Sequence, residues 1–179
     1  MWGGTEDVDT EVCASGLSAS LYSASSDGGK GGDIYYFTVC SHDALARVVV
    51  ADVVGHGAAV NTISKWLYAA LLEQLDSLDG NAVLTELNRR VSEHGLDALT
   101  TAAVVSFYAD NSNLYFSYAG HPPLLMRRRH DSGWHAVNLE PNAGPTHLPL
   151  GVLPHTTYEQ ARLPLAAGDR LFLLHRRLD

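Results

Sequence analysis

The sequence predicts an α+β protein with a mainly antiparallel sheet. Runs rich in β-branched and aromatic residues come first, two helical patterns follow one another directly, and strand-like runs resume at residue 100. This order differs from the regular alternation of strand and helix that builds a parallel sheet. The 179 residues contain neither an internal repeat nor a linker-like stretch, so we expect one domain over residues 1–179.

Three strands are expected in the first 54 residues. Leu17, Ala19 and Leu21 alternate with serine, which is typical of a half-buried strand. The runs "IYYFTVC" and "ARVVVADVV" are separated only by "SHDAL". Their enrichment in β-branched and aromatic residues predicts a β-hairpin.

Two helices are expected next. After Gly57, apolar residues recur at helical spacing, which predicts a long helix with one inward face. The residues of that face are Ala59, Val60, Ile63, Trp66, Leu67, Ala70 and Leu71. A second helix is expected over about residues 81–94, with Gly95 as its stop.

Further strands are expected in the second half of the chain. The runs "TTAAVVSFYA" and "LYFSYAG" flank the turn "DNSN". Shorter strands are expected in "LLMRRR", "WHAVNL", "YEQARL" and "RLFLL", the last of them introduced by the turn "AAGD".

Composition argues against several functions. The net charge of −8 disfavours a nucleic-acid partner, and "RRRH" at residues 127–130 is more typical of a solvated turn than of an anion site. No apolar run approaches the about 20 residues that span a bilayer, so no membrane association is expected. Cys13 and Cys40 form no CxxC pair, which suits a cytoplasmic protein and argues against a zinc cluster; Cys40 is expected in the core.

Two aspartates are the main candidates for a functional site. Asp33 follows two glycines at the start of one expected strand, and Asp52 lies near the end of the next. In an antiparallel hairpin these positions meet at one edge of the sheet, where paired carboxylates suit Mg²⁺ or Mn²⁺. Glycine followed by aspartate is also ordinary turn chemistry, so the spacing by itself leaves a purely structural interpretation open.

Five segments, in this order, resemble those of a known family. They are "GGDIYYF", "ADVVGHGAAV", "TTAAVVSFYADNSNLYFSYAGHPPLLMRR", "LPLGVLP" and "AAGDRLFLL". Together they are similar to the SpoIIE and RsbU group of bacterial PPM-type, or type 2C, serine/threonine phosphatases. The resemblance extends over about residues 33–174.

The resemblance implies two stacked antiparallel β-sheets flanked by α-helices, with two Mn²⁺ or Mg²⁺ ions between the sheets. Carried over to this chain, Asp33 and Asp52 become catalytic metal ligands, Asp52 bridges both ions, and Val53 contributes its carbonyl oxygen. A water held by the ions would attack phosphoserine or phosphothreonine on a regulatory protein such as an anti-sigma factor antagonist. His56 is then expected to have a structural or supporting role, and His121 to fix a turn by hydrogen bonding.

The chain departs from the family pattern at its last residues. Where the family typically continues "LLYTDG", this sequence has Leu174, His175, Arg176 and Arg177 in the last four places. An arginine in the aspartate position cannot ligate a cation. Codons for Tyr-Thr-Asp-Gly read one base out of register contain His-Arg-Arg, which suggests a frameshifted or prematurely ended gene with its C-terminal part missing.

Two functions therefore stay open at this point, besides an unrelated α+β domain. One is a metal-dependent protein serine/threonine phosphatase, which both aspartates favour. The other is a catalytically impaired phosphatase-like domain that binds a regulatory protein, which Arg176 favours.

Overall fold

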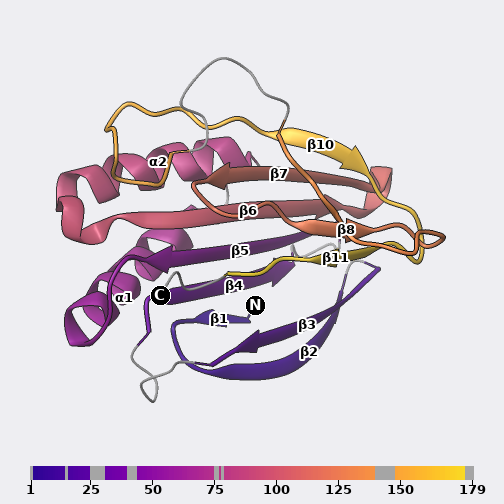
Figure 1. Ribbon diagram of the computed structural model, residues 1–179, viewed down its shortest axis with the longest axis horizontal. Coiled ribbons are helices and arrows are strands. Elements are labelled where there is room, and N and C mark those ends of the chain that lie inside the picture. Colours follow the sequence, from indigo (N-terminus) through magenta and orange to yellow (C-terminus); the bar gives the residue numbers. More distant parts are fainter. Residues whose placement is uncertain are drawn as a thin grey trace.

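The structure, a computed structural model, describes residues 2–14, 16–24, 31–39, 44–74, 77, 79–139 and 148–175. Its main element is a six-stranded sheet in the spatial order β1-β4-β5-β6-β7-β10, with every neighbouring pair antiparallel (Figure 1). The strands are β1 (Trp2–Gly4), β4 (Asp33–Val39), β5 (Leu45–Val53), β6 (Thr100–Tyr108), β7 (Asn113–Ala119) and β10 (Ala161–Pro164). The expected α+β class with antiparallel pairing is confirmed.

Strands β4 and β5 form the predicted hairpin, which carries both candidate aspartates. The register runs from Asp33 opposite Asp52 to Val39 opposite Ala46. Strand β6 pairs with β5 along its whole length and is buried on both faces, since its valines and alanines contribute to the cores on either side. The two aspartates therefore lie at the end of a hairpin whose strand β5 is paired along its whole length with the buried strand β6.

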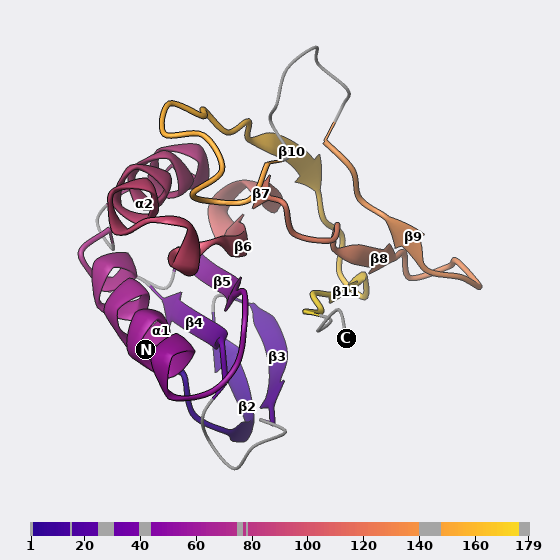
Figure 2. The ribbon, with the colours of Figure 1, turned by 60° about the vertical axis from the view of Figure 1, so that its left-hand side comes forward.

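Helices α1 (Ala58–Leu72) and α2 (Gly80–His94) cover one face of this sheet (Figure 2). Val60, Leu67 and Leu71 of the predicted face are buried, but Ala59 is exposed. The side chain of Asp79 accepts the backbone N–H of Asn81 and caps α2. The predicted stop at Gly95 is confirmed, with φ at 99°.

Two smaller sheets lie on the other face of the six-stranded sheet, opposite the helices (Figure 2). One pairs β2 (Val8–Ala14) with β3 (Leu17–Ser23), and the other has the order β11-β8-β9. The strands of the second are β8 (Leu125–Arg127), β9 (His135–Ala136) and β11 (Arg170–Phe172). The expected stacking of antiparallel sheets is confirmed, with the second layer divided in two.

Several strands differ in extent from the expected runs. Only Ala161–Pro164 of the region around "YEQARL" pairs with β7, and only His135–Ala136 of "WHAVNL" pairs with β8. Strands β1 and β2 were not expected, because Val8–Ala14 carries acidic residues at its exposed positions and glycines fill β1. Distant parts of the chain supply the partners of β1 and β10, whereas β2 and β9 pair with the neighbouring strands β3 and β8; local composition shows none of these limits.

Two expectations from composition concern single residues. The turn after β8 is present, but Arg128 is not simply solvated, because its guanidinium lies 2.6 Å from the carboxylate of Asp169. Cys13 is a free, exposed thiol, whereas Cys40 lies outside the described residues.

Neither helix in the described parts of the chain is both long and apolar enough to cross a bilayer.

Candidate metal centre

Asp33 and Asp52 lie directly opposite one another across the β4–β5 pair. Directly opposite residues of an antiparallel pair project to the same face of the sheet, with their Cβ atoms about 5 Å apart. Their neighbours Ile34 and Ala51 belong to the core beneath the helices. Because side chains alternate along a strand, the two carboxylates project to the opposite face, toward the second layer of sheets.

Crowding at position 32 explains why a glycine precedes Asp33. A Cβ atom at position 32 would collide with the carbonyl oxygen of Val53 and would lie 2.8 Å from Oδ1 of Asp52. The backbone N–H of Val53 donates to the carbonyl oxygen of Gly32 at 3.1 Å. The missing side chain therefore allows the start of β4 and the end of β5 to approach closely, and it brings the Val53 carbonyl beside the aspartates.

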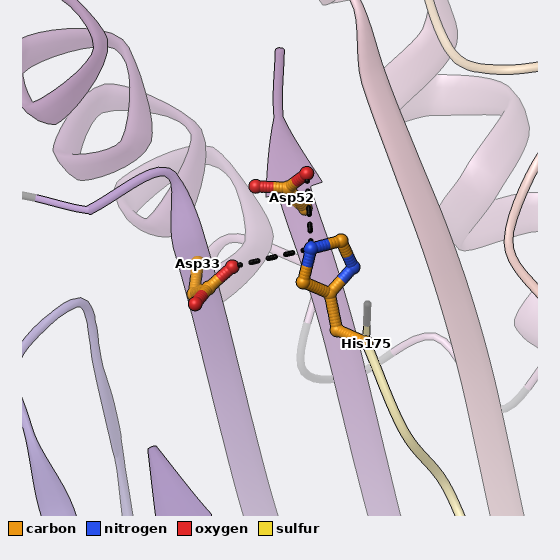
Figure 3. Close-up of side chains that lie close together, drawn as sticks. All are labelled: Asp33, Asp52 and His175. Atoms are coloured by element: carbon orange, nitrogen blue, oxygen red, sulfur yellow. Dashed lines mark ion pairs between the residues drawn. The ribbon is translucent and has the colours of Figure 1, made fainter. Parts of the chain in front are cut away.

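His175 is the third residue of the site, and it comes from the segment that follows β11 (Figure 3). Its Nε2 lies 3.1 Å from Oδ2 of Asp52 and 3.5 Å from Oδ1 of Asp33. One donor atom from each residue can be chosen so that all three lie within 4.8 Å of one another. The side chains are 14% exposed for His175, 21% for Asp52 and 41% for Asp33, so the site opens on the Asp33 side.

The environment of His175 favours a positive charge at this place. Burial acts to lower the pKa of the imidazole, but the contact with Asp52 and the charges of Asp52 and Asp33 outweigh it, so the pKa is raised above its ordinary value. Despite the short distances, neither ring nitrogen meets the directional geometry of a hydrogen bond. The site therefore attracts cations, and Nε2 lies at ion-pair distance from both carboxylates.

His121 lies next to this group. It is 6% exposed, and its ring centroid is 6.1 Å from that of His175. Its Nδ1 lies 2.7 Å from the carbonyl oxygen of Pro122, which can only accept, so Nδ1 carries the proton. The predicted hydrogen bond is present, but it lies in an irregular segment between β7 and β8 where no turn is assigned, and it leaves Nε2 buried without a hydrogen-bond partner. Burial lowers the pKa of His121, which keeps the ring neutral.

His56 does not join the group of donors that the described residues form. It lies on the exposed turn between β5 and α1. Its structural role stays a prediction. Arg176 and Arg177, which raise the question of activity, lie outside the described residues.

The donor set suits a hard or borderline divalent cation. Two carboxylates supply charge and oxygen atoms, and the Gly32 backbone leaves room for close approach of the Val53 carbonyl. Both aspartates were predicted from the sequence, whereas His175 was matched only to a place in "LLYTDG" and was given no role. The return of the chain after β11 brings His175 to the hairpin.

Comparison with known proteins identifies the family to which the chain belongs. The family model described as stage II sporulation protein E (SpoIIE) matches residues 42–174. This match covers most of the chain, and the chain belongs to the SpoIIE family. No curated protein matches.

Three solved structures illustrate the fold that the chain shares. The RsbU and RsbW domains of Rv1364c from Mycobacterium tuberculosis have a TM-score of 0.68 and 24% identity, covering 83% of this chain and 39% of that one. The PP2C phosphatase domain of SpoIIE from Bacillus subtilis, with a fragment of its regulatory domain, has a TM-score of 0.65 and 20% identity, covering 84% and 43%. RsbX in complex with magnesium has a TM-score of 0.60 and 16% identity, covering 79% and 64%.

These likenesses define the fold as that of the PP2C-type phosphatase domains. The chain spans less than two thirds of the length of each of these three proteins.

Proposed function

We propose that this protein is a metal-dependent phosphatase that hydrolyses phosphoserine or phosphothreonine on a regulatory protein. The observation that carries the proposal is the convergence of Asp33 and Asp52 on one face of the β4–β5 edge. Membership of the SpoIIE family and the PP2C-type fold support the same reaction class. The cofactor proposed is Mn²⁺ or Mg²⁺, and one similar structure contains magnesium.

Each residue of the site has a proposed task. The carboxylates of Asp33 and Asp52 would hold the ion, and the carbonyl of Val53, brought close by Gly32, would add a neutral oxygen. An ion held there would supply charge that polarises a phosphoryl oxygen and would lower the pKa of a nearby water. Asp33 is the most exposed of the donors, so its side of the site admits a phosphorylated side chain of another protein.

The substrate proposed is a phosphorylated anti-sigma factor antagonist. Two of the similar structures include a further domain, an RsbW domain in one and a fragment of the SpoIIE regulatory domain in the other. A phosphatase domain that occurs beside such partners is consistent with a protein substrate.

Release of phosphate from a phosphoserine-containing antagonist protein in the presence of Mn²⁺ tests the proposal. Asp52→Asn should reduce the rate by at least about 100-fold, because it removes a charged ligand of the ion on which the reaction depends. Asp110→Asn is the matched control, since Asp110 lies on the exposed turn between β6 and β7. Equal rates for wild type and Asp52→Asn would remove Asp52 from the reaction.

A second function is favoured by one observation. His175 lies between the carboxylates at ion-pair distance, as a positive group would if it took the place of the metal. The chain would then be a catalytically impaired domain that binds a regulatory protein. Calorimetric titration with Mn²⁺ separates the two functions, because the impaired domain would bind no ion at this site while still binding the antagonist protein.

A further inference from the structure

We propose that His175 is a metal ligand, and that Asp33, Asp52 and His175 form a site for one ion with two oxygen donors and one nitrogen donor. Such a site would select borderline transition metals such as Zn²⁺ and Co²⁺ over Mg²⁺. The inference rests on the proposed roles of Asp33 and Asp52 as ligands. It adds a ligand, a stoichiometry and a metal preference to them.

The separations between the donor atoms are the first argument. Around an ion with bonds of roughly 2.1 Å, neighbouring ligands lie roughly 3.0 Å apart in octahedral and roughly 3.4 Å apart in tetrahedral geometry. Nε2 of His175 lies 3.1 Å from Asp52 Oδ2 and 3.5 Å from Asp33 Oδ1. Nε2 of His175 therefore already has the spacing of a ligand that shares an ion with either carboxylate, and the three donor atoms lie within 4.8 Å of one another.

The orientation of the imidazole is the second argument. An ion-paired histidine normally directs an N–H at one carboxylate oxygen, yet no ring nitrogen of His175 does so, although both are shielded from solvent. In Figure 3 the Nε2 edge of the ring points into the space between the two carboxylates. A lone pair on Nε2 would point to an ion in that space.

His121 supplies an independent observation. It is more than nine-tenths buried, its Nδ1–H donates to the Pro122 carbonyl, and its unprotonated Nε2 has no partner. A histidine that ligates through Nε2 carries its proton on Nδ1 and needs an acceptor for it. Nδ1 of His175 is also buried without a hydrogen bond, and the two ring centroids, 6.1 Å apart, are separated by about 1 Å more than in a direct N–H···N contact. His121 therefore offers an unprotonated ring nitrogen close to the His175 ring, although no hydrogen bond joins the two rings.

The chemistry of the donors sets the metal preference. Mg²⁺ strongly prefers oxygen ligands and an octahedral shell rich in water, whereas imidazole nitrogen suits Zn²⁺, Co²⁺ and Ni²⁺. A mixed set of two carboxylates and one imidazole should therefore bind Co²⁺ and Zn²⁺ more tightly than Mn²⁺, and Mn²⁺ more tightly than Mg²⁺.

The test uses the full chain loaded with single metals in the absence of substrate. Co²⁺ binding is followed by its visible absorption and by calorimetry, and nitrogen coordination by the ¹⁴N coupling of bound Cu²⁺ in pulsed electron paramagnetic resonance. Three variants are compared with wild type: His175→Ala, His175→Asp, and His155→Ala as a control on an exposed histidine.

We expect one Co²⁺ per chain in wild type and a clear ¹⁴N coupling. Loss of a supporting group around a metal typically costs 10- to 100-fold in affinity, so His175→Ala, which removes a ligand, should weaken Co²⁺ binding by at least about 100-fold and abolish the coupling. His175→Asp should recover Mg²⁺ and Mn²⁺ binding without the coupling, because it completes a set of three carboxylates. His155→Ala should behave as wild type.

Three results would overturn the inference. One is Co²⁺ binding with unchanged affinity in His175→Ala, and another is ¹⁴N coupling that persists in that variant. The third is tighter binding in His175→Ala, which is the result expected if His175 competes with the ion for the carboxylates. If Asp52→Asn abolishes binding while His175→Ala does not, this inference fails and the proposed function stands. If wild type binds Co²⁺ through His175 but hydrolyses no phosphoprotein, the proposed function fails and this inference stands.

Discussion

Asp33 lies directly opposite Asp52 in the register of strands β4 and β5, and both carboxylates point away from the helices. Like charges directly opposite in a sheet are destabilising by up to about 1 kcal/mol, so the pair has a free-energy cost that a bound cation removes. The arrangement therefore couples metal binding to the stability of the fold.

The first prediction follows from this coupling. A ligand at 100 times its dissociation constant stabilises the folded state by about 2.7 kcal/mol. For a domain of this size, that corresponds to a rise in Tm of about 5–10 °C. Calorimetry should show this rise with Co²⁺ or Mn²⁺ for wild type and for Asp110→Asn. Asp52→Asn should show no rise, and an equal rise in Asp52→Asn would mean that the ion binds elsewhere.

The second prediction concerns the glycine before Asp33. Gly32→Ala should lower the free energy of unfolding by about 1–3 kcal/mol, because the new methyl group collides with the Val53 carbonyl and crowds Asp52. Metal affinity should fall with it, since both groups would have to move. Gly133→Ala is the matched control, because no atom lies within 4 Å of a Cβ at Gly133. Urea unfolding measures the free energy of unfolding, and calorimetric titration with Co²⁺ measures the metal affinity. Similar unfolding curves for the two variants would contradict the close approach at Gly32.

A third prediction concerns the turn that leads into β11 and so positions His175. The carboxylate of Asp169 is 4% exposed, accepts the backbone N–H groups of Ala166 and Arg129, and pairs with Arg128. Burial alone would raise the pKa of Asp169, but these hydrogen bonds and the Arg128 charge lower it below its ordinary 3.8. Asp169→Asn should therefore lower the free energy of unfolding by about 2 kcal/mol at neutral pH.

The pH dependence of that difference has a defined sign. Because the folded-state pKa of Asp169 is lowered, its stabilising effect is fully present above pH 3.8 and is lost as the pH falls through the folded value. Urea unfolding of wild type and Asp169→Asn at neutral pH and at a series of acid values should show the difference shrinking only below about pH 4. A difference that stays constant with pH would show that the Asp169 charge contributes nothing.

The fourth prediction concerns Asn88, which fixes the "LPLGVLP" segment on α2. Its side-chain amide donates to the carbonyls of Leu153 and Pro154, and its oxygen accepts the N–H of Gly151, all in a fully buried position. Asn88→Asp loses both donors and places a carboxylate against two carbonyl oxygens. We expect a loss of at least about 3 kcal/mol in the free energy of unfolding.

Glu93→Gln, on the exposed side of α2, is the control for that variant, because it changes one surface ion pair with Arg89 and should cost less than about 1 kcal/mol. Thermal unfolding at neutral pH compares the two. An Asn88→Asp protein as stable as wild type would mean that the loop does not depend on this side chain.

Much of the fold could be predicted from local sequence. The β4–β5 hairpin follows from two runs rich in β-branched and aromatic residues around a short connection, and the end of α2 follows from Gly95. Hairpin geometry alone then brings Asp33 and Asp52 together, which is why this half of the site was expected.

The remainder depends on contacts between distant parts of the chain. β1 pairs with β4, β10 pairs with β7 and β11 pairs with β8, so partners far away in the sequence define these strands. His175 reaches the aspartates through the pairing of β11 with β8 and the turn held by Asp169. Neither feature leaves a periodic pattern in the sequence, so the third donor could only be found in three dimensions.

Anomalous diffraction from crystals grown with Mn²⁺ tests directly whether Asp33, Asp52 and His175 hold a metal ion. We predict a manganese peak within bonding distance of the carboxylates of Asp33 and Asp52 and of Nε2 of His175. Asp52→Asn crystals grown in the same way should show no such peak. A wild-type map without a peak at this place, or with manganese bound only elsewhere, would contradict this prediction.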